Sequence, residues 1–231
     1  MTRRDEIRER RRRKKQKQRL TLVLILSGVA LIITSILIVT TVRQRVIETS
    51  VLTAKGNALG DPSSPVVIHE FTDFGCGHCG NFAAETAPQI IAEYVETGQV
   101  YIVYHSVGSM LSPLSALAAE AVYCAGDQEK FWEYHDTLFE NQSALYSNSD
   151  LGFTTTLKTY AQDLGLDMNL FNTCFDQGEQ KERVTNDQLY AQQSGIHSTP
   201  SFLVNGTLYV GALPYEQFKN LIDAEFAKVG N

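Results

Sequence analysis

The sequence predicts an α/β fold in which a β-α-β unit and a β-β-α unit are separated by an inserted helical subdomain and preceded by one transmembrane helix. Three observations predict it: an uncharged run of 23 residues near the N-terminus, two β-branched runs on either side of a helical segment, and an Asn-Gly pair between two further strand-like runs. A chain of 231 residues has room for one large domain with appendages.

The N-terminal region joins a basic tail to an apolar run. Residues 1–19 contain eleven Lys or Arg and three acidic residues, whereas residues 20–42 contain no charged residue. As a helix, the apolar run is about 34 Å long, which is enough to cross a hydrocarbon core of about 30 Å. Because positive charge is retained on the cytoplasmic side, we expect a cytoplasmic tail (1–19), a single-pass helix in the cell membrane (20–42) and an extracytoplasmic C-terminal domain.

Three other interpretations of this region fit less well. A cleaved signal peptide has a shorter apolar run, of about 7–15 residues, and ends in a small-x-small site that does not follow here. A buried core helix rarely lacks charge over such a length. A basic tail by itself would fit nucleic acid binding, but its place directly before a membrane span explains the charge, so we expect no nucleic acid partner.

A linker is predicted to join the transmembrane helix to the folded domain. Turn-forming residues are concentrated between Gly60 and Pro65. We therefore expect a linker over residues 43–64 and one folded domain over residues 65–231, which is long enough to bury a single core.

The folded domain begins with a predicted β-α-β unit. The β-branched run 66–71 predicts a buried strand, and the run 100–104 predicts a second one. Between them, apolar residues at helical spacing predict a helix over residues 82–95, which Pro88 is expected to kink. Two strands joined by a helix favour a parallel pair.

Helical patterns then replace strands over about residues 106–195. Apolar residues at helical spacing indicate five helices in this insert. Asp167 has the residue type of a helix N-cap, and Gly195 that of a helix stop.

The C-terminal part predicts a hairpin and a last helix. Strand-like runs at residues 201–204 and 207–210 flank Asn205-Gly206, which is the strongest short-range hairpin signal. Pro214 then marks the start of an amphipathic helix.

The motif that carries chemistry is Cys76-Gly77-His78-Cys79, at the start of a helix. Residues three apart are neighbours on a helical turn, so the two cysteines can form a small disulfide. Free backbone N–H groups and the helix dipole stabilise a thiolate at Cys76 and lower its pKa, and a protonated His78 adds positive charge. A stabilised thiolate makes the disulfide form a stronger oxidant. Cys79, one turn deeper, is placed to attack a mixed disulfide.

Two simpler roles for this motif, a zinc site and a purely structural disulfide, are less well supported by the sequence. A structural zinc site needs about four ligands, and no second Cys-x-x-Cys or His pair accompanies the motif, so we expect no metal at these residues, while a metal elsewhere on the acidic domain stays open. A purely structural disulfide across three residues closes too short a loop to stabilise the fold much. Four cysteines, an even number, lie in the part expected to be exported, which agrees with a compartment where disulfides persist.

The motif, the strand before it, Thr199-Pro200 before a later strand and the helical insert together resemble the thioredoxin fold of the DsbA-like thiol–disulfide oxidoreductases, in their membrane-anchored form. The resemblance covers residues 60–231 and includes segments 118–124 and 130–135 of the insert. It implies an enzyme that introduces disulfides into exported proteins without a bound cofactor. It also implies reoxidation by a membrane quinone-linked partner of the DsbB or VKOR type.

The same resemblance implies roles for individual residues. Cys76 is expected to be the attacking and attacked sulfur, and Cys79 the resolving one. Pro200 is expected to follow a cis peptide bond, and Thr199 to offer its backbone to an extended substrate. Glu70 matches a carboxylate that thioredoxin-fold proteins often bury, where its pKa is raised and it can exchange a proton with Cys79. The alternative for Glu70 is a solvent-facing place at the strand end.

The dipeptide between the cysteines leaves the direction of the reaction open. Gly-His is shared with protein disulfide isomerase, whereas the better-known DsbA enzymes carry Pro-His. An isomerase or reductase is therefore an alternative to the oxidase. A non-catalytic substrate-binding (holdase) module is a third hypothesis.

Cys124 and Cys174 require a separate explanation, since both fall on predicted helices of the insert beside apolar residues. A structural disulfide between them is favoured, and it would close a loop of about 50 residues. Buried free thiols and a second redox pair remain open. His69 and His105 lie in or next to strands, and the sequence shows no partner for either.

Overall fold

The computed structural model describes residues 54–108, 110–147 and 150–229. The predicted cytoplasmic tail, the predicted transmembrane helix and residues 43–53 of the predicted linker lie outside these ranges. Within the described part, no helix combines the length and the apolar character that a membrane crossing requires.

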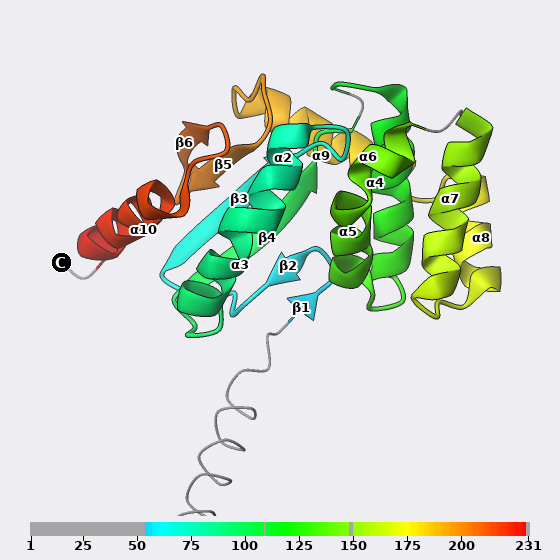
Figure 1. Cartoon of the computed structure of the whole chain (residues 1–231). Helices are drawn as coiled ribbons and strands as arrows, with labels where there is room; N and C mark the ends of the chain where they lie inside the picture. The colour runs from blue at the N-terminus through cyan, green and yellow to red at the C-terminus, as the bar shows by residue number, and fades with distance from the viewer. Residues whose placement is uncertain (1–53, 109, 148–149, 230–231) are drawn as a thin grey trace, which may run out of the picture. The chain divides into compact units, whose positions relative to one another are not determined.

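Six strands of the described chain form one sheet in the order β1-β2-β4-β3-β5-β6 (Figure 1). β3 pairs in parallel with β4 and antiparallel with β5, and β5 pairs antiparallel with β6. These pairings confirm the predicted β-α-β and β-β-α units. The strands are β1 (Ala54–Lys55), β2 (Ala58–Leu59), β3 (Val66–Thr72), β4 (Val100–Ser106), β5 (Ser201–Val204) and β6 (Thr207–Val210).

Two of these strands correct the predicted linker. β1 and β2 pair with each other, and β2 pairs with β4 through Ala58 and Leu59. The sheet therefore begins inside the segment predicted as linker (43–64). Strands of two residues are too short to show the alternation that identifies a strand in a sequence.

Different helices cover the two faces of the sheet. Val66 and Ile68 pack with the helical stretch 77–95 and with α10 (Tyr215–Val229), whereas Phe71 packs with α9 (Lys181–Gln193) on the other face. Successive residues of a strand point to opposite faces, so Glu70 shares the face of Ile68.

The helical stretch after β3 contains two π-helical segments. It begins at Gly77, as the cysteine motif at a helix start predicted, and five residues before the apolar pattern of residues 82–95, because the segment around the cysteines has no apolar spacing. The Ala87 N–H donates to the Phe82 carbonyl, five residues earlier. Pro88 has no N–H with which to continue a regular ladder, which explains the wider turn beside it. The segments are α2 (Gly77–Asn81), η1 (Phe82–Thr86), α3 (Ala87–Ile90) and η2 (Ile91–Val95).

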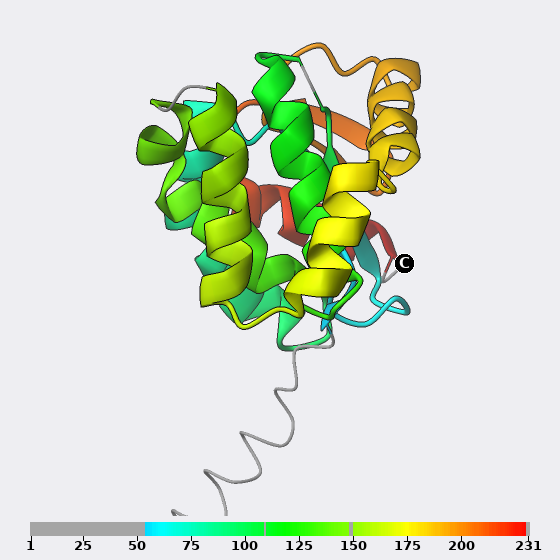
Figure 2. The ribbon, with the colours of Figure 1, turned by 90° about the vertical axis from the view of Figure 1, so that its right-hand side faces the viewer.

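In the described residues, the insert comprises six helices between β4 and β5, and Figure 2 turns this block towards the viewer. α4 is buried over most of its length, so the neighbouring helices pack around it. Asp167 caps α8 as predicted, because its Oδ1 accepts the N–H groups of Asn169 and Leu170. The helices are α4 (Pro113–Gly126), α5 (Phe131–Glu140), the unpredicted α6 (Gln142–Tyr146), α7 (Asp150–Asp163), α8 (Met168–Gln177) and α9.

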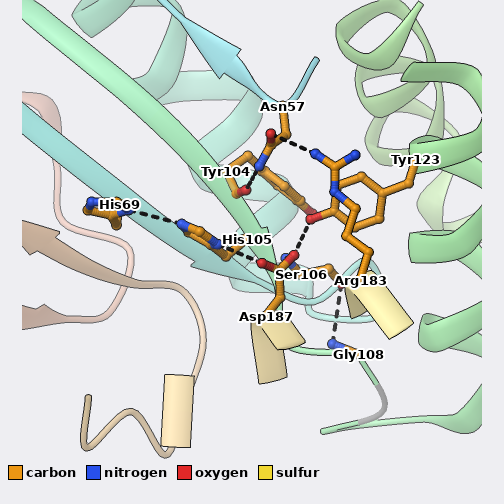
Figure 3. Close-up of polar contacts among 9 residues, drawn as sticks. All are labelled: Asn57, His69, Tyr104, His105, Ser106, Gly108, Tyr123, Arg183 and Asp187. Atoms are coloured by element: carbon orange, nitrogen blue, oxygen red, sulfur yellow. Dashed lines mark hydrogen bonds and ion pairs between the residues drawn. The ribbon is translucent and has the colours of Figure 1, made fainter. Parts of the chain in front are cut away.

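A chain of polar contacts joins α9 to the sheet (Figure 3). The His105 Nδ1 lies 2.7 Å from the Asp187 Oδ1, and its Nε2 lies 2.9 Å from the His69 Nδ1. The second oxygen of Asp187 accepts the Ser106 N–H and the Tyr123 hydroxyl. Since a carboxylate only accepts, the His105 Nδ1 donates to Asp187. Both histidines thus have partners that the sequence does not reveal.

Arg183 extends this network to the N-terminal strands (Figure 3). Its guanidinium lies 4.0 Å above the Tyr123 ring and donates to the Asn57 Oδ1 at 2.8 Å. The Asn57 carbonyl accepts the Tyr104 N–H at 2.9 Å, and the Asn57 amide donates to the Tyr104 carbonyl at 2.5 Å. The last helix of the insert is therefore held to the β1–β2 turn as well as to β4.

A disulfide between Cys124 in α4 and Cys174 in α8 closes a loop with a sequence separation of 50. We predict that replacing both cysteines by Ala lowers the free energy of unfolding by about 2–4 kcal/mol, because the unfolded chain regains the entropy of the open loop. Urea unfolding without reductant measures this loss. Wild-type protein with this disulfide reduced is the control and should resemble the variant. Equal stability of the variant and the oxidised wild type would contradict the prediction.

Candidate active site

Cys76 sits at the point where the first helical stretch begins. It is the N-cap residue of α2, with extended backbone angles (φ −85°, ψ 114°). Its carbonyl accepts the N–H groups of Cys79 and Gly80, both at 3.1 Å. Cys76 is 6% exposed and Cys79 is fully buried, and both are free thiols. The pair is therefore arranged as expected, with one sulfur at the rim and the other one turn behind it.

Fixed donors around Cys76 lower the pKa of its thiol to about 5. The largest contribution is a hydrogen bond from the Cys79 thiol; Thr199 and the backbone N–H groups of Cys79 and His78 add to it, and burial opposes it. The effect of His78 thus comes from its backbone, while its side chain is exposed. At neutral pH, Cys76 is a thiolate.

Cys79 shows the opposite shift. Burial, followed by the hydrogen bond to Cys76, raises the pKa of the Cys79 thiol far above its ordinary value. Because the two sulfurs share one hydrogen bond, ionisation of Cys76 depends on Cys79 keeping its proton. In the reduced pair, Cys76 is thus the nucleophile and Cys79 is a protonated thiol.

The loop before β5 lies against the reactive sulfur. The Thr199–Pro200 peptide bond is cis, as the family resemblance implied. The Cys76 Sγ lies 3.4 Å from the Thr199 carbonyl oxygen. Two segments more than 120 residues apart in the sequence therefore meet at the sulfur.

Glu70 is buried in β3 and is not solvent-facing, with 6% of its surface exposed. Burial raises the pKa of its carboxyl group to about 8. Burial also raises the pKa of Tyr104 well above its ordinary value, and the charges of both Glu70 and Cys79 contribute. The Tyr104 hydroxyl thus interacts with the charges of both groups, which indicates that Glu70 and Cys79 face the same part of the interior. At neutral pH, Glu70 holds a proton.

Two residues that the sequence did not single out hold the active-site loop. The Asp73 carboxylate accepts the N–H groups of Gly75 at 2.7 Å and Leu111 at 3.1 Å. The Gln142 amide donates to the carbonyls of Phe74 and Cys76. An Asp directly after a strand is a common turn signal, so Asp73 could have been noticed. Nothing in the sequence points to Gln142.

A reactive Cys-x-x-Cys pair at a helix start, next to a cis-proline loop and a buried carboxyl group, defines a thioredoxin-fold protein with a redox-competent dithiol. The family model described as Thioredoxin matches residues 53–224. The chain belongs to this family, and the predicted thioredoxin fold with a helical insert is confirmed.

Similar proteins fall into two groups. The Na(+)/H(+) antiporter NhaA 1 of Salinispora arenicola is 31% identical over 168 residues, which are 73% of this chain and 24% of the antiporter. The chain therefore spans about a quarter of the length of that relative. Disulfide bond formation protein D of Bacillus subtilis is 28% identical over 180 residues, covering 72% of this chain and 75% of the relative.

Solved structures support the same fold. The crystal structure of alpha-DsbA1 from Wolbachia pipientis superposes with a TM-score of 0.66 at 24% identity. The match covers 75% of this chain and 92% of that structure. The similarity places the helical insert within the shared architecture.

We predict that the Cys76 thiol of the reduced protein is half-ionised near pH 5. The ultraviolet absorbance of the thiolate, followed against pH, measures this transition. Because the shift depends on the position of Cys76 in the fold, unfolding the protein should move it to the range of a free cysteine. A Cys76→Ser variant should lack the transition near pH 5. Half-ionisation above about pH 8 in the folded protein would contradict the assignment.

Glu70→Gln should stabilise the protein increasingly as the pH rises. The folded pKa of Glu70 is about 8, above its ordinary value of 4.5, so the folded state binds more protons between these values and wild-type stability falls there. Between pH 5 and pH 7 the stability of Glu70→Gln relative to the wild type should rise by roughly 2–3 kcal/mol. Urea unfolding of the oxidised forms between about pH 5 and pH 8 measures it, since Cys76 does not titrate in a disulfide. If the difference in the free energy of unfolding between the two proteins does not change with pH, the raised pKa of Glu70 is contradicted.

Proposed function

We propose that the protein is a DsbA-like thiol–disulfide oxidoreductase that introduces disulfides into exported proteins. The single observation that carries this proposal is the position of the pair: Cys76 lies at the N-cap of α2 beside the Thr199 carbonyl and Cys79 is fully buried, which shifts the pKa values of the two thiols in opposite directions. A stable thiolate stabilises the reduced, dithiol form of the pair. The corresponding disulfide is therefore readily reduced by the thiols of other proteins. This chemistry favours oxidation of clients.

The reaction begins with the Cys76–Cys79 disulfide. A client thiolate attacks the Cys76 sulfur, the bond to Cys79 breaks, and Cys79 leaves with the electron pair. A second client thiolate then attacks the client sulfur of the mixed disulfide and displaces Cys76 as a thiolate. The client loses two electrons and gains a disulfide, while the enzyme pair gains the two electrons as a dithiol.

Glu70 supplies the proton that this step needs. Cys79 leaves as a thiolate that its buried site strongly disfavours, so it must take up a proton. Glu70 is protonated at neutral pH, and its charge acts on Tyr104 together with that of Cys79, which supports a place near this thiol. We assign Glu70 as the proton donor during reduction and as the acceptor when the pair is reoxidised.

Thr199 and Pro200 are assigned to client binding. The Thr199 carbonyl lies 3.4 Å from the Cys76 sulfur. An extended client segment that pairs with the Thr199 backbone would bring its own cysteine next to this sulfur, as in strand addition.

The cellular location of the protein and the partner that reoxidises it are part of the same proposal. The apolar run 20–42 behind a basic tail supports a membrane anchor with the catalytic domain outside the cytoplasm. A membrane quinone-linked reoxidase of the DsbB or VKOR type would then accept the electrons. Anchoring both proteins in one membrane raises their effective concentration.

An isomerase or reductase is the second candidate, and the Gly-His dipeptide favours it. The two candidates differ in the reduction potential of the Cys76–Cys79 couple and in its redox state in cells. A predominantly oxidised pair in cells supports the oxidase, whereas a predominantly reduced pair supports the alternative.

Cys79→Ala should accumulate mixed disulfides between Cys76 and exported proteins, because the resolving thiol is missing. Non-reducing electrophoresis of cells that express the variant, with and without added reductant, detects these adducts. Cys76→Ala is the matched control and should form none. If Cys79→Ala also forms no adducts although Cys76 remains reactive towards an alkylating agent, exchange with clients is not its function.

A further inference from the structure

Gln142 connects the helical insert to the reactive loop. Its Nε2 lies 2.8 Å from the Phe74 carbonyl and 2.9 Å from the Cys76 carbonyl. Carbonyl oxygens only accept hydrogen bonds, so the NH₂ group must face them, and each of its hydrogens has one partner. Both donors of the amide are therefore used on the segment that carries the reactive cysteine.

The Cys76 carbonyl is the acceptor on which the first helical turn is built. It accepts the N–H groups of Cys79 and Gly80, and the N–H groups of His78 and Cys79 in turn lower the pKa of the Cys76 thiol. Gln142 approaches the same carbonyl from outside the helix. Fixing this carbonyl fixes the direction in which the first N–H groups of the helix point.

Gly80 makes room for this contact. A Cβ atom at position 80 would lie 3.0 Å from the Gln142 Oε1, closer than ordinary van der Waals contact. Glycine inside a helix costs about 1 kcal/mol relative to alanine. The close approach of the amide gives a physical reason for glycine at this position.

We propose that Gln142 is a positioning residue that holds the start of α2 so that its N–H groups stabilise the Cys76 thiolate. This inference rests on the proposed thiol exchange at Cys76. The insert thereby takes part in setting the reactivity of the pair. Gln142 acts through the backbone, because the hydrogen bonds of its amide go to the carbonyls of Phe74 and Cys76.

Gln142→Met, made in the full-length protein, removes both donors and keeps an unbranched side chain. We measure alkylation of Cys76 by iodoacetamide near pH 5, where the thiol is half-ionised, and near pH 9, where it is fully ionised. The ratio of the rate at the lower pH to the rate at the higher pH should fall about threefold, because only the thiolate reacts. A variant that is less stable but stays folded at both pH values would keep this ratio, so circular dichroism at about pH 5 and pH 9 must show that Gln142→Met and its control variant are folded.

Gln128→Met is the matched control. The Gln128 amide also bridges two backbone groups, the Asp167 N–H and carbonyl, but within the insert. This variant should keep the wild-type ratio. An equal fall of the ratio in both variants, or no fall in Gln142→Met, overturns the inference.

Gly80→Ala tests the same contact from the other side. The new methyl group displaces the amide, so this variant should lower the ratio although alanine favours the helix. The double variant should be no worse than Gln142→Met alone, since both changes remove one contact. Fully additive effects would overturn the inference. A wild-type thiol that is not ionised near pH 5 contradicts the proposed function itself, and this inference with it.

Discussion

The whole site depends on keeping one negative charge on Cys76 while its neighbour stays neutral. The two sulfurs share a hydrogen bond, so the ionised one needs the proton of the other. Burial decides which sulfur keeps the proton, because Cys79 is fully enclosed and Cys76 lies at the rim. This asymmetry is set by the position of the helix start and needs no charged side chain in contact with the thiolate.

The scaffold around the pair keeps that helix start in place from several directions. The active-site loop follows β3, Asp73 closes the turn after the strand, and the Thr199 carbonyl lies against the Cys76 sulfur. The segment that follows β4 supplies two further contacts: the Leu111 N–H donates to Asp73, and the Gln142 amide donates to the Cys76 carbonyl. The insert is therefore coupled to the reactive loop by polar contacts as well as by packing, and Asp187 and Arg183 attach its last helix to the sheet.

The sequence was sufficient where a few residue types restrict the chemistry. Cys76 and Cys79 followed from their spacing at a helix start, and the Asn205-Gly206 hairpin from its turn chemistry. Pro200, Thr199 and Glu70 came from family resemblance; in the structure the Thr199 carbonyl lies 3.4 Å from the Cys76 sulfur, the bond before Pro200 is cis, and Glu70 is buried in β3. The His105–Asp187 contact spans 82 residues and the Gln142–Cys76 contact spans 66, so no local pattern could show them. β1, β2 and α6 were too short to produce a periodic signal.

The Cys124–Cys174 bond has a consequence for how new copies mature. A freshly made chain has four thiols and must lose two electrons from this pair before its insert is covalently complete. The reaction that completes it is of the same kind as the one proposed for Cys76. An acceptor must take these two electrons, and under the function proposed above the disulfide of Cys76 and Cys79 in another copy has the chemistry to do so.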